Sequence, residues 1–269
     1  MPEVTSPRPP GTPCWIDLVT PDQQAAIDFY AELFGWSGAP GPPETGGYAV
    51  CELRGLPVAG IMSSRAPTGA DDEPAAPTMW TTYLSSTDAD ATAEAIRGSG
   101  GTVHSPVIDV LDLGRMLVAT DPAGAVFGVW EARRFTGSGV VGEPGAPVWH
   151  ELNTTDPRTA ADFYRSALGV EARPMEGAED YYHALAVDGR TVGGMQALPA
   201  SAPPEAVSHW LTYFAVADAD AAIARLTAAG GTVLQPPFDM VAGRMALVTD
   251  AQGAPFAMIT PTPTGDAAS

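Results

Sequence analysis

Residues Trp149–Val170 read WHELNTTDPRTAADFYRSALGV, and residues Trp15–Trp36 read WIDLVTPDQQAAIDFYAELFGW. The two stretches align without a gap, so both contain the tripeptide DFY at the same place and Asp22 falls on Asp156. Each pattern predicts a short strand, a turn with a capping aspartate, one helix and a glycine stop. Because an internal repeat determines the architecture of a chain, this duplication is the main evidence for the fold.

A second pair of repeated stretches follows the first pair. Trp80–Gly101 and Trp210–Gly231 each predict a strand, a helix and a double-glycine stop, followed by further strands. The chain therefore predicts an α+β fold of four strand–helix–three-strand units, two in each half. We expect a disordered tail at residues 1–12, a first domain at 13–132, a linker at 133–146 and a second domain at 147–261.

Composition and charge exclude several classes of function. The chain has 269 residues, a net charge of -19 and 13 basic residues, all of them arginine. Nucleic acids and anionic membranes are therefore not expected as partners, because both bind positive surfaces, whereas a cationic ligand would be attracted. The lack of lysine excludes Schiff-base catalysis and a phosphate-binding P-loop.

The sequence contains no recognisable targeting signal. No apolar run reaches the roughly 18 residues of a membrane span, and the N-terminal segment MPEVTSPRPPGTP lacks the pattern of a signal peptide. We therefore expect a cytoplasmic protein in which Cys14 and Cys51 are free, buried thiols. Two repeated halves in one chain predict a monomer that acts as a pseudo-dimer, or a weak homodimer.

The order of these motifs resembles the vicinal oxygen chelate superfamily, which includes glyoxalase I, extradiol dioxygenases and fosfomycin- and bleomycin-resistance proteins. The strand before Asp22 or Asp156 and the DFY helix resemble the first βαβββ unit of that superfamily, and the closing segment DPAGAVFGVWE resembles the end of the second. The tandem arrangement is similar to a two-domain actinobacterial branch typified by a mycobacterial antigen. The resemblance implies two glyoxalase-like domains, each with a mixed sheet curled into a cup.

Metal-using members of that superfamily bind a divalent ion through three side chains in the cup. The resemblance places these positions at Trp15, Thr81 and Gly128 in one half, and at Trp149, Leu211 and Ala257 in the other. None is a usual ligand of a divalent metal, Thr81 being a weak one at best. A shift of one residue would bring in His150 and His209 but would turn them to the opposite face of the strand. We expect both halves to be free of metal and of any other cofactor.

Strand alternation predicts which side chains line each cup. In the first half they are Trp15, Asp17, Tyr83 and Trp130, and in the second they are Trp149, Glu151, Asn153, Leu211, Tyr213 and Ala257. Each cup is thus expected to hold a tryptophan, a carboxylate and, beside them, a tyrosine on apolar walls, which suits a small-molecule pocket. These are our candidate ligand-binding residues, and Glu151 and Tyr213 are also candidate catalytic residues.

Structural roles remain open for the same side chains. The two tryptophans could belong to the core, and the carboxylates of Asp17 and Glu151 could pair with Arg115 and Arg244. The spacing favours a different use of these arginines, as partners of Asp109 and Asp239 in braces between neighbouring strands.

His183 is a third candidate catalytic residue because the two halves differ there. The first half has Ala49 at the matching position, and His183 follows Tyr182 on a hairpin that we expect to lie over the second cup. Histidine titrates near neutral pH and could donate a proton there. Since Asn153 also replaces Val19, the second cup is expected to be the more specific one.

Two functions fit this set of residues, and a third fits less well. The first is metal-independent binding of a small aromatic or cationic metabolite or antibiotic, in a binding, sequestration or resistance role. The alternative is a metal-free isomerase, cyclase or lyase of secondary metabolism, with Glu151 as general base and Tyr213 or His183 as proton donor. A metal-dependent glyoxalase or dioxygenase is disfavoured by the residues at the six ligand positions.

Overall fold

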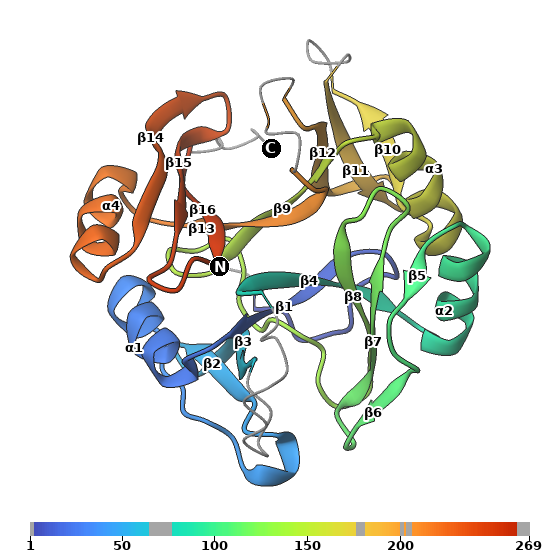
Figure 1. The fold of residues 1–269 in the computed structure, drawn as a ribbon, viewed down its shortest axis with the longest axis horizontal. Coiled ribbons are helices and arrows are strands. Elements are labelled where there is room, and N and C mark those ends of the chain that lie inside the picture. Colours follow the sequence, from blue (N-terminus) through green and yellow to red (C-terminus); the bar gives the residue numbers. More distant parts are fainter. Residues whose placement is uncertain (1–2, 65–76, 176–180, 200–201, 203–205, 263–269) are drawn as a thin grey trace, which may run out of the picture.

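The computed structural model describes residues 3–64, 77–175, 181–199, 202 and 206–262. These residues form two eight-stranded mixed sheets, one in each half of the chain, with the helices on their outer faces (Figure 1). Within the described residues, no helix is long and apolar enough to span a membrane.

The first sheet has the strand order β2-β3-β1-β4-β8-β7-β5, and β6 pairs with β7. Its strands are β1 (Pro13–Thr20), β2 (Ala49–Leu53), β3 (Leu56–Ser63), β4 (Met79–Ser86), β5 (Thr102–Val103), β6 (Ile108–Val110), β7 (Gly114–Thr120) and β8 (Val126–Ala132). The helices of this half are α1 (Gln23–Phe34), the short 3-10 helix η1 (Pro43–Thr45) and α2 (Ala89–Gly98).

The second sheet has the order β10-β11-β12-β9-β13-β16-β15-β14. Its strands are β9 (Pro147–Thr154), β10 (Glu171–Pro174), β11 (Tyr182–Val187), β12 (Arg190–Ala197), β13 (His209–Ala215), β14 (Thr232–Met240), β15 (Gly243–Thr249) and β16 (Pro255–Pro261). The helices are α3 (Pro157–Leu168) and α4 (Ala219–Ala228).

All four helices begin in the way that the repeat predicts. Asp22, Asp88, Asp156 and Asp218 are the N-caps, and each accepts a hydrogen bond from the backbone N–H three residues later. This bond satisfies a donor that the first helical turn leaves unpaired. The helices α1 and α3 end at glycines in the left-handed conformation, which glycine adopts without steric cost.

The two units of each half pair within that half. Strands β1 and β4 are antiparallel neighbours with Asp17 opposite Thr81, and β9 and β13 repeat this pairing with Glu151 opposite Leu211. The sequence had left open whether the units pair within a half or exchange across halves. The central β1–β4 and β9–β13 pairs place the first strands of two units side by side in each cup.

The cores on the helix side are shared between the halves. One core combines Phe29 and Trp36 of the first half with Phe214 and Phe256 of the second. The other core combines strands β7 and β8 and helix α2 with helix α3 and strands β9 to β12. Accordingly, α1 lies beside α4 and α2 beside α3 (Figure 1). We call these contacts the α1/α4 seam and the α2/α3 seam.

The tyrosine of each DFY motif joins the two halves. The Tyr30 hydroxyl donates to Asp250 Oδ2 at 3.0 Å and accepts from Trp80 Nε1 at 3.1 Å. In the other seam, the Tyr164 hydroxyl donates to Asp121 Oδ2 at 3.2 Å, and Trp210 Nε1 donates to Tyr164 at 2.9 Å. The duplicated motif therefore supplies both helix packing and a polar link across the pseudo-symmetric interface.

The N-terminal segment differs from the expected disordered tail over the part that is described. Residues 3–12 run along the body of the protein, and backbone hydrogen bonds join Val4 to Gly139 at 3.0 Å and Gly11 to Ser85 at 2.8 Å. The bond that matches Gly11–Ser85 in the other half runs from the Gly145 backbone N–H to the Ala215 carbonyl, at 2.8 Å. The segment is ordered because it repeats the contact that the linker makes with β13.

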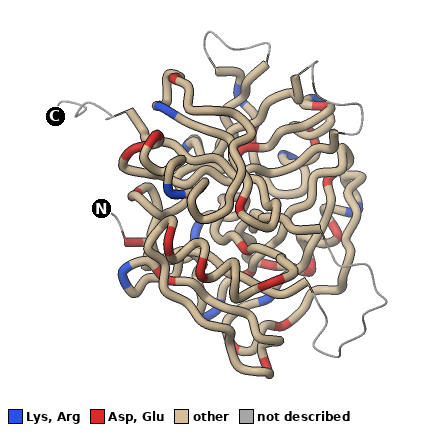
Figure 2. Tube along the Cα trace, turned by 60° about the vertical axis from the view of Figure 1, so that its left-hand side comes forward, with Lys and Arg blue, Asp and Glu red and all other residues tan. Residues whose placement is uncertain are grey.

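Acidic residues are spread along the whole visible chain, with basic residues interspersed (Figure 2). The expected Asp–Arg braces are present, because Arg115 lies 3.8 Å from Asp109 and Arg244 lies 3.2 Å from Asp239. Arg115 also contacts Asp90 and Glu131. The two arginines are thus engaged at the outer strands, and neither makes an ion pair with Asp17 or Glu151 among the described residues.

Candidate functional site

The first cup is the face of the first sheet opposite its helices, lined by Trp15, Asp17, Tyr83 and Trp130. Asp17 Oδ2 accepts hydrogen bonds from the hydroxyls of Tyr83 at 2.9 Å and Tyr48 at 3.4 Å. Tyr48 in turn accepts a bond of 2.7 Å from Trp15 Nε1. The expected tryptophan, carboxylate and tyrosine are therefore brought together, and Tyr48 completes the chain of bonds.

The Asp17 carboxyl group lies in an environment that favours its neutral form. Burial raises its pKa to about 7, although hydrogen bonds from Tyr83 and Tyr48 lower it in part. Its Oδ1 atom is buried without a hydrogen-bond partner in the described structure. Thr81 is close enough to lower the pKa of Asp17 but makes no hydrogen bond to Oδ1.

The second cup is the matching face of the second sheet, lined by Trp149, Glu151, Tyr213 and Tyr182. Glu151 Oε1 accepts hydrogen bonds from the Tyr213 hydroxyl at 2.9 Å and from Gln196 Nε2 at 2.8 Å. Trp149 Nε1 donates to the Tyr182 hydroxyl at 3.1 Å, as Trp15 does to Tyr48. Burial raises the pKa of Glu151, and the hydrogen bond from Tyr213 opposes this rise.

The other predicted residues of the second cup lie around Glu151. Asn153 Oδ1 accepts a bond of 2.9 Å from Gln196 Nε2, and its own Nδ2 is buried without an acceptor of suitable geometry in the described structure. Leu211 and Ala257 form the apolar wall, together with Tyr213, Met245 and Ile259. The cup therefore combines one carboxyl group, amide donors and flat aromatic rings on an apolar base.

His183 lies on the other face of its strand, away from Glu151. In the β11–β12 pair, Tyr182 stands opposite Gln196 and His183 opposite Met195. Antiparallel partners share a face, and Met195 is buried in the core under α3. The expectation that His183 lies over the cup thus fails for geometrical reasons, because Tyr182 occupies the inward position. His183 Nδ1 has no hydrogen-bond partner in the described part of the chain.

Two tyrosines and one glutamine of the site were not predicted. Tyr48 directly precedes β2 and Tyr182 begins β11, and a Cβ atom on Gly60 or Gly194 would lie 1.8 Å or 2.0 Å from their hydroxyls. Both tyrosines and both glycines align in the repeat, which is the signal that could have identified them. Gln196 matches Met62 and carries no such signal.

The two cups differ in how they are covered. In the first cup, Trp15 is 4% exposed and Trp130 is 6% exposed, because Phe135 of the linker packs over them. In the second cup, Trp149, Tyr182 and Gln196 are partly exposed. The tryptophan of the second cup is therefore more accessible than that of the first, whereas Tyr48 is partly exposed just as Tyr182 is.

The donor set of neither cup suits a divalent metal ion. Trp15 and Trp149 use their indole nitrogens as donors, and Gly128 leaves room for the Tyr83 ring, whose Cδ1 would lie 2.2 Å from an added Cβ. Each cup offers one carboxyl group surrounded by hydroxyl and amide donors rather than several metal ligands. Across the described ranges, no group of three or more His, Cys, Asp and Glu side chains is arranged to hold a metal.

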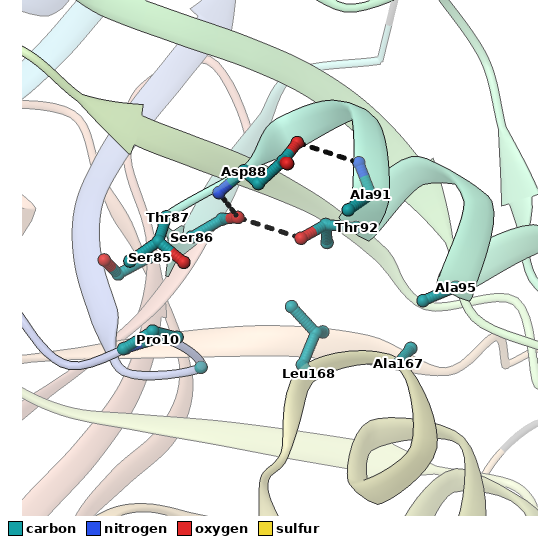
Figure 3. A pocket seen from close by; sticks show the side chains of 11 residues that line it. Pro10, Ser85, Ser86, Thr87, Asp88, Ala91, Thr92, Ala95, Ala167 and Leu168 are labelled. Atoms are coloured by element: carbon teal, nitrogen blue, oxygen red, sulfur yellow. Dashed lines mark hydrogen bonds between the residues drawn. The ribbon is translucent and has the colours of Figure 1, made fainter.

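A separate pocket of about 270 Å³ lies in the α2/α3 seam (Figure 3). Ser85, Thr92 and Leu168 are among its lining residues, and no candidate residue of the cups lines it. The hydroxyls of Ser86 and Thr92 lie 2.8 Å apart and satisfy each other. Because these polar groups are already paired, the pocket has little to offer a specific ligand.

The fold and the paired cups define the class of protein. Residues 14–129 and 147–258 match the family model described as Glyoxalase/Bleomycin resistance protein/Dioxygenase superfamily, and the chain belongs to that superfamily. The Mn(II)-bound glyoxalase from Novosphingobium aromaticivorans has a similar structure, with a TM-score of 0.63, 17% identity, and coverage of 95% of this chain and 89% of that one. The 2,3-dioxygenase LapB from Pseudomonas sp. KL28 gives a TM-score of 0.61 at 13% identity, covering 94% of each chain. At these identities the likeness concerns the fold alone.

Curated relatives are more similar in sequence. "Putative glyoxylase CFP32" of Mycobacterium bovis is 41% identical over 259 residues, which cover 94% of this chain and 96% of the relative. The "Anthracycline biosynthesis protein DnrV" of Streptomyces peucetius is 36% identical over 261 residues, which cover 93% of both chains. One of these relatives is thus named for anthracycline biosynthesis.

Proposed function

We propose that the protein binds a flat aromatic small molecule in the second cup and that it does so without a metal ion. The observation that carries this proposal is the buried carboxyl group of Glu151, held by Tyr213 and Gln196 beside the partly exposed ring of Trp149. Aromatic walls with a few fixed polar groups are typical of small-molecule sites. A relative named for anthracycline biosynthesis supports a polycyclic aromatic ligand from secondary metabolism.

The net charge of -19 adds a preference among such ligands. A negative field attracts cations and raises their local concentration. An aromatic ligand that carries an amine is therefore favoured over one that carries a carboxylate. The donor set described above supports binding through hydrogen bonds and ring contacts rather than through a metal.

Binding can be tested by titrating the protein with a hydroxyanthraquinone while following tryptophan fluorescence. Trp149→Ala is expected to weaken binding by about 2 kcal/mol or more, because it removes a central aromatic anchor. Glu151→Gln is expected to weaken it at least about tenfold, equivalent to about 1.4 kcal/mol. Asp17→Asn is the matched control in the other cup and should change little. If the wild-type protein shows no quenching, the proposal fails, and if Asp17→Asn alone weakens binding, the ligand lies in the first cup.

A metal-free isomerase, cyclase or lyase is the second candidate. It is favoured by the raised pKa of Glu151, because a buried carboxylate of higher pKa is a stronger general base. Tyr213, which donates to Glu151, would then be the proton donor. Conversion of the bound ligand, abolished by Glu151→Gln while binding persists, would favour this candidate over simple binding.

A further inference from the structure

The linker between the halves closes the first cup with one aromatic ring. The backbone N–H groups of Arg133 and Phe135 both donate to the Leu113 carbonyl at 3.0 Å. Trp130 Nε1 donates to the Phe135 carbonyl at 2.8 Å. These three bonds attach the linker to the β6–β7 turn and to β8, and they direct Phe135 over the cup.

The Phe135 ring packs against both tryptophans of the first cup. Its centroid is 4.8 Å from that of Trp15 at an interplanar angle of 88°, and 5.9 Å from that of Trp130 at 83°. Edge-to-face contacts at these distances are favourable between aromatic rings. Phe135 therefore acts as a built-in occupant, and this explains why the side chains beneath it are almost inaccessible.

A hydrocarbon ring leaves one polar group of the first cup unsatisfied. Asp17 Oδ2 accepts from two tyrosine hydroxyls, whereas Oδ1 is buried without a donor in the described structure. An unpaired buried acceptor costs free energy. When Asp17 is ionised, above its pKa of about 7, an aromatic ring that carries a hydroxyl or amino group would supply the missing donor as well as the ring contacts.

The second cup has no such occupant among the described residues. Phe238 packs against the same apolar cluster as Trp149, but Trp149 remains partly exposed, whereas Trp15 is buried. The tryptophan–tyrosine–carboxylate–tyrosine set is repeated in both cups, so this shared set does not account for the difference. In the first cup, Phe135 packs over the tryptophans and is held there by its attachment to the linker.

We propose that the first cup is a second ligand site, held shut by Phe135, and that it takes a single-ring aromatic molecule with a hydrogen-bond donor, such as a phenol. Among the described residues, Phe135 covers Trp15 and Trp130 of this site, whereas Trp149 of the second cup stays partly exposed. Release of residues 133–136 exposes a ready-made site with two aromatic walls and an unpaired acceptor. This inference does not depend on what the second cup binds, because the test counts an added site.

The test uses 4-fluorophenol as the probe and fluorobenzene as its matched analogue without a donor, both followed by ¹⁹F NMR and calorimetric titration at about pH 8, where Asp17 is ionised. Phe135→Ala is expected to bind one more equivalent of 4-fluorophenol than the wild-type chain does. The double variant Phe135→Ala with Asp17→Leu should lose this added equivalent or bind it at least tenfold more weakly. Fluorobenzene should bind the Phe135→Ala variant at least tenfold more weakly than 4-fluorophenol.

Two results would overturn the proposal. One is a folded Phe135→Ala variant that binds no added 4-fluorophenol. The other is equal affinity for 4-fluorophenol and fluorobenzene, which would indicate only a dry apolar cavity of the kind that side-chain truncation creates. If Phe135→Ala does not fold, Phe135→Val keeps part of the apolar contact and is judged by the same two criteria.

Discussion

Asp17 and Glu151 hold matching positions in the two cups but meet different neighbours. Asp17 Oδ1 has no partner in the described structure, whereas Glu151 has Gln196 and Asn153 beside it. The matching positions in the first half carry Met62 and Val19, which cannot donate a hydrogen bond. At these two positions the Asp17 carboxyl group therefore has apolar neighbours, whereas the Glu151 carboxyl group has polar ones.

The Asp17 environment predicts a pH dependence of stability. Its pKa is about 7 in the folded protein and about 3.9 in an unfolded chain, so the folded state holds a proton that the unfolded state has lost. The contribution of Asp17 to the free energy of unfolding is fully present below about pH 4 and is lost as the pH rises to about 7. The loss is up to about 4 kcal/mol.

Asp17→Asn should remove this dependence. Its free energy of unfolding, measured with urea relative to that of the wild-type chain, is expected to rise between pH 4 and pH 7 and to level off above pH 7. A difference between the two proteins that stays constant over this range would contradict the protonated, buried state of Asp17.

At the scale of elements, helices α1 and α3 carry the links between the halves. Tyr30→Phe should cost about 1–3 kcal/mol, because it leaves Trp80 Nε1 and Asp250 Oδ2 buried without their shared partner. Tyr164→Phe should cost a similar amount in the other seam. The control is Tyr181→Phe, since Tyr181 is 59% exposed. Unfolding midpoints that are equal in all three variants would show that the buried hydroxyls contribute nothing.

Strand β12 shapes the second cup through one glycine. A Cβ atom at position 194 would lie 2.0 Å from the Tyr182 hydroxyl, so Gly194→Ala should displace Tyr182 and break its hydrogen bond with Trp149. We expect at least tenfold weaker binding of the hydroxyanthraquinone. Gly60→Ala is the matched control, because it makes the same clash with Tyr48 in the closed cup. Unchanged affinity in Gly194→Ala would show that Tyr182 is not part of the binding surface.

At the scale of the whole molecule, the two halves are not independent. Each of the two helix-side cores contains residues from both halves, and the polar links cross both seams. The chain should therefore unfold in one calorimetric transition, because neither half can keep its core without the other. Residues 1–140 alone should fail to form a stable monomer. Two separated transitions, or a folded monomeric half, would contradict the shared cores.

The amino-acid sequence by itself determined the repeat, the four units and the inward face of the central strands. These features follow from local rules: capping and glycine stops mark the helix ends, and the period of two assigns side chains to faces of a strand. For this reason the sequence correctly brought Trp15, Asp17 and Tyr83 together, and likewise Trp149, Glu151 and Tyr213.

Only the tertiary structure decided how strands distant in the sequence meet. The inward place of Tyr182, and with it the outward place of His183, depends on the register of β11 against β12. The bonds from Tyr48 and Gln196 to the carboxyl groups join residues distant in the sequence. The position of Phe135 depends on where the linker attaches, and the shared cores depend on how the halves pack. Pairing register and packing join residues far apart in the chain, and no local period of the sequence encodes them.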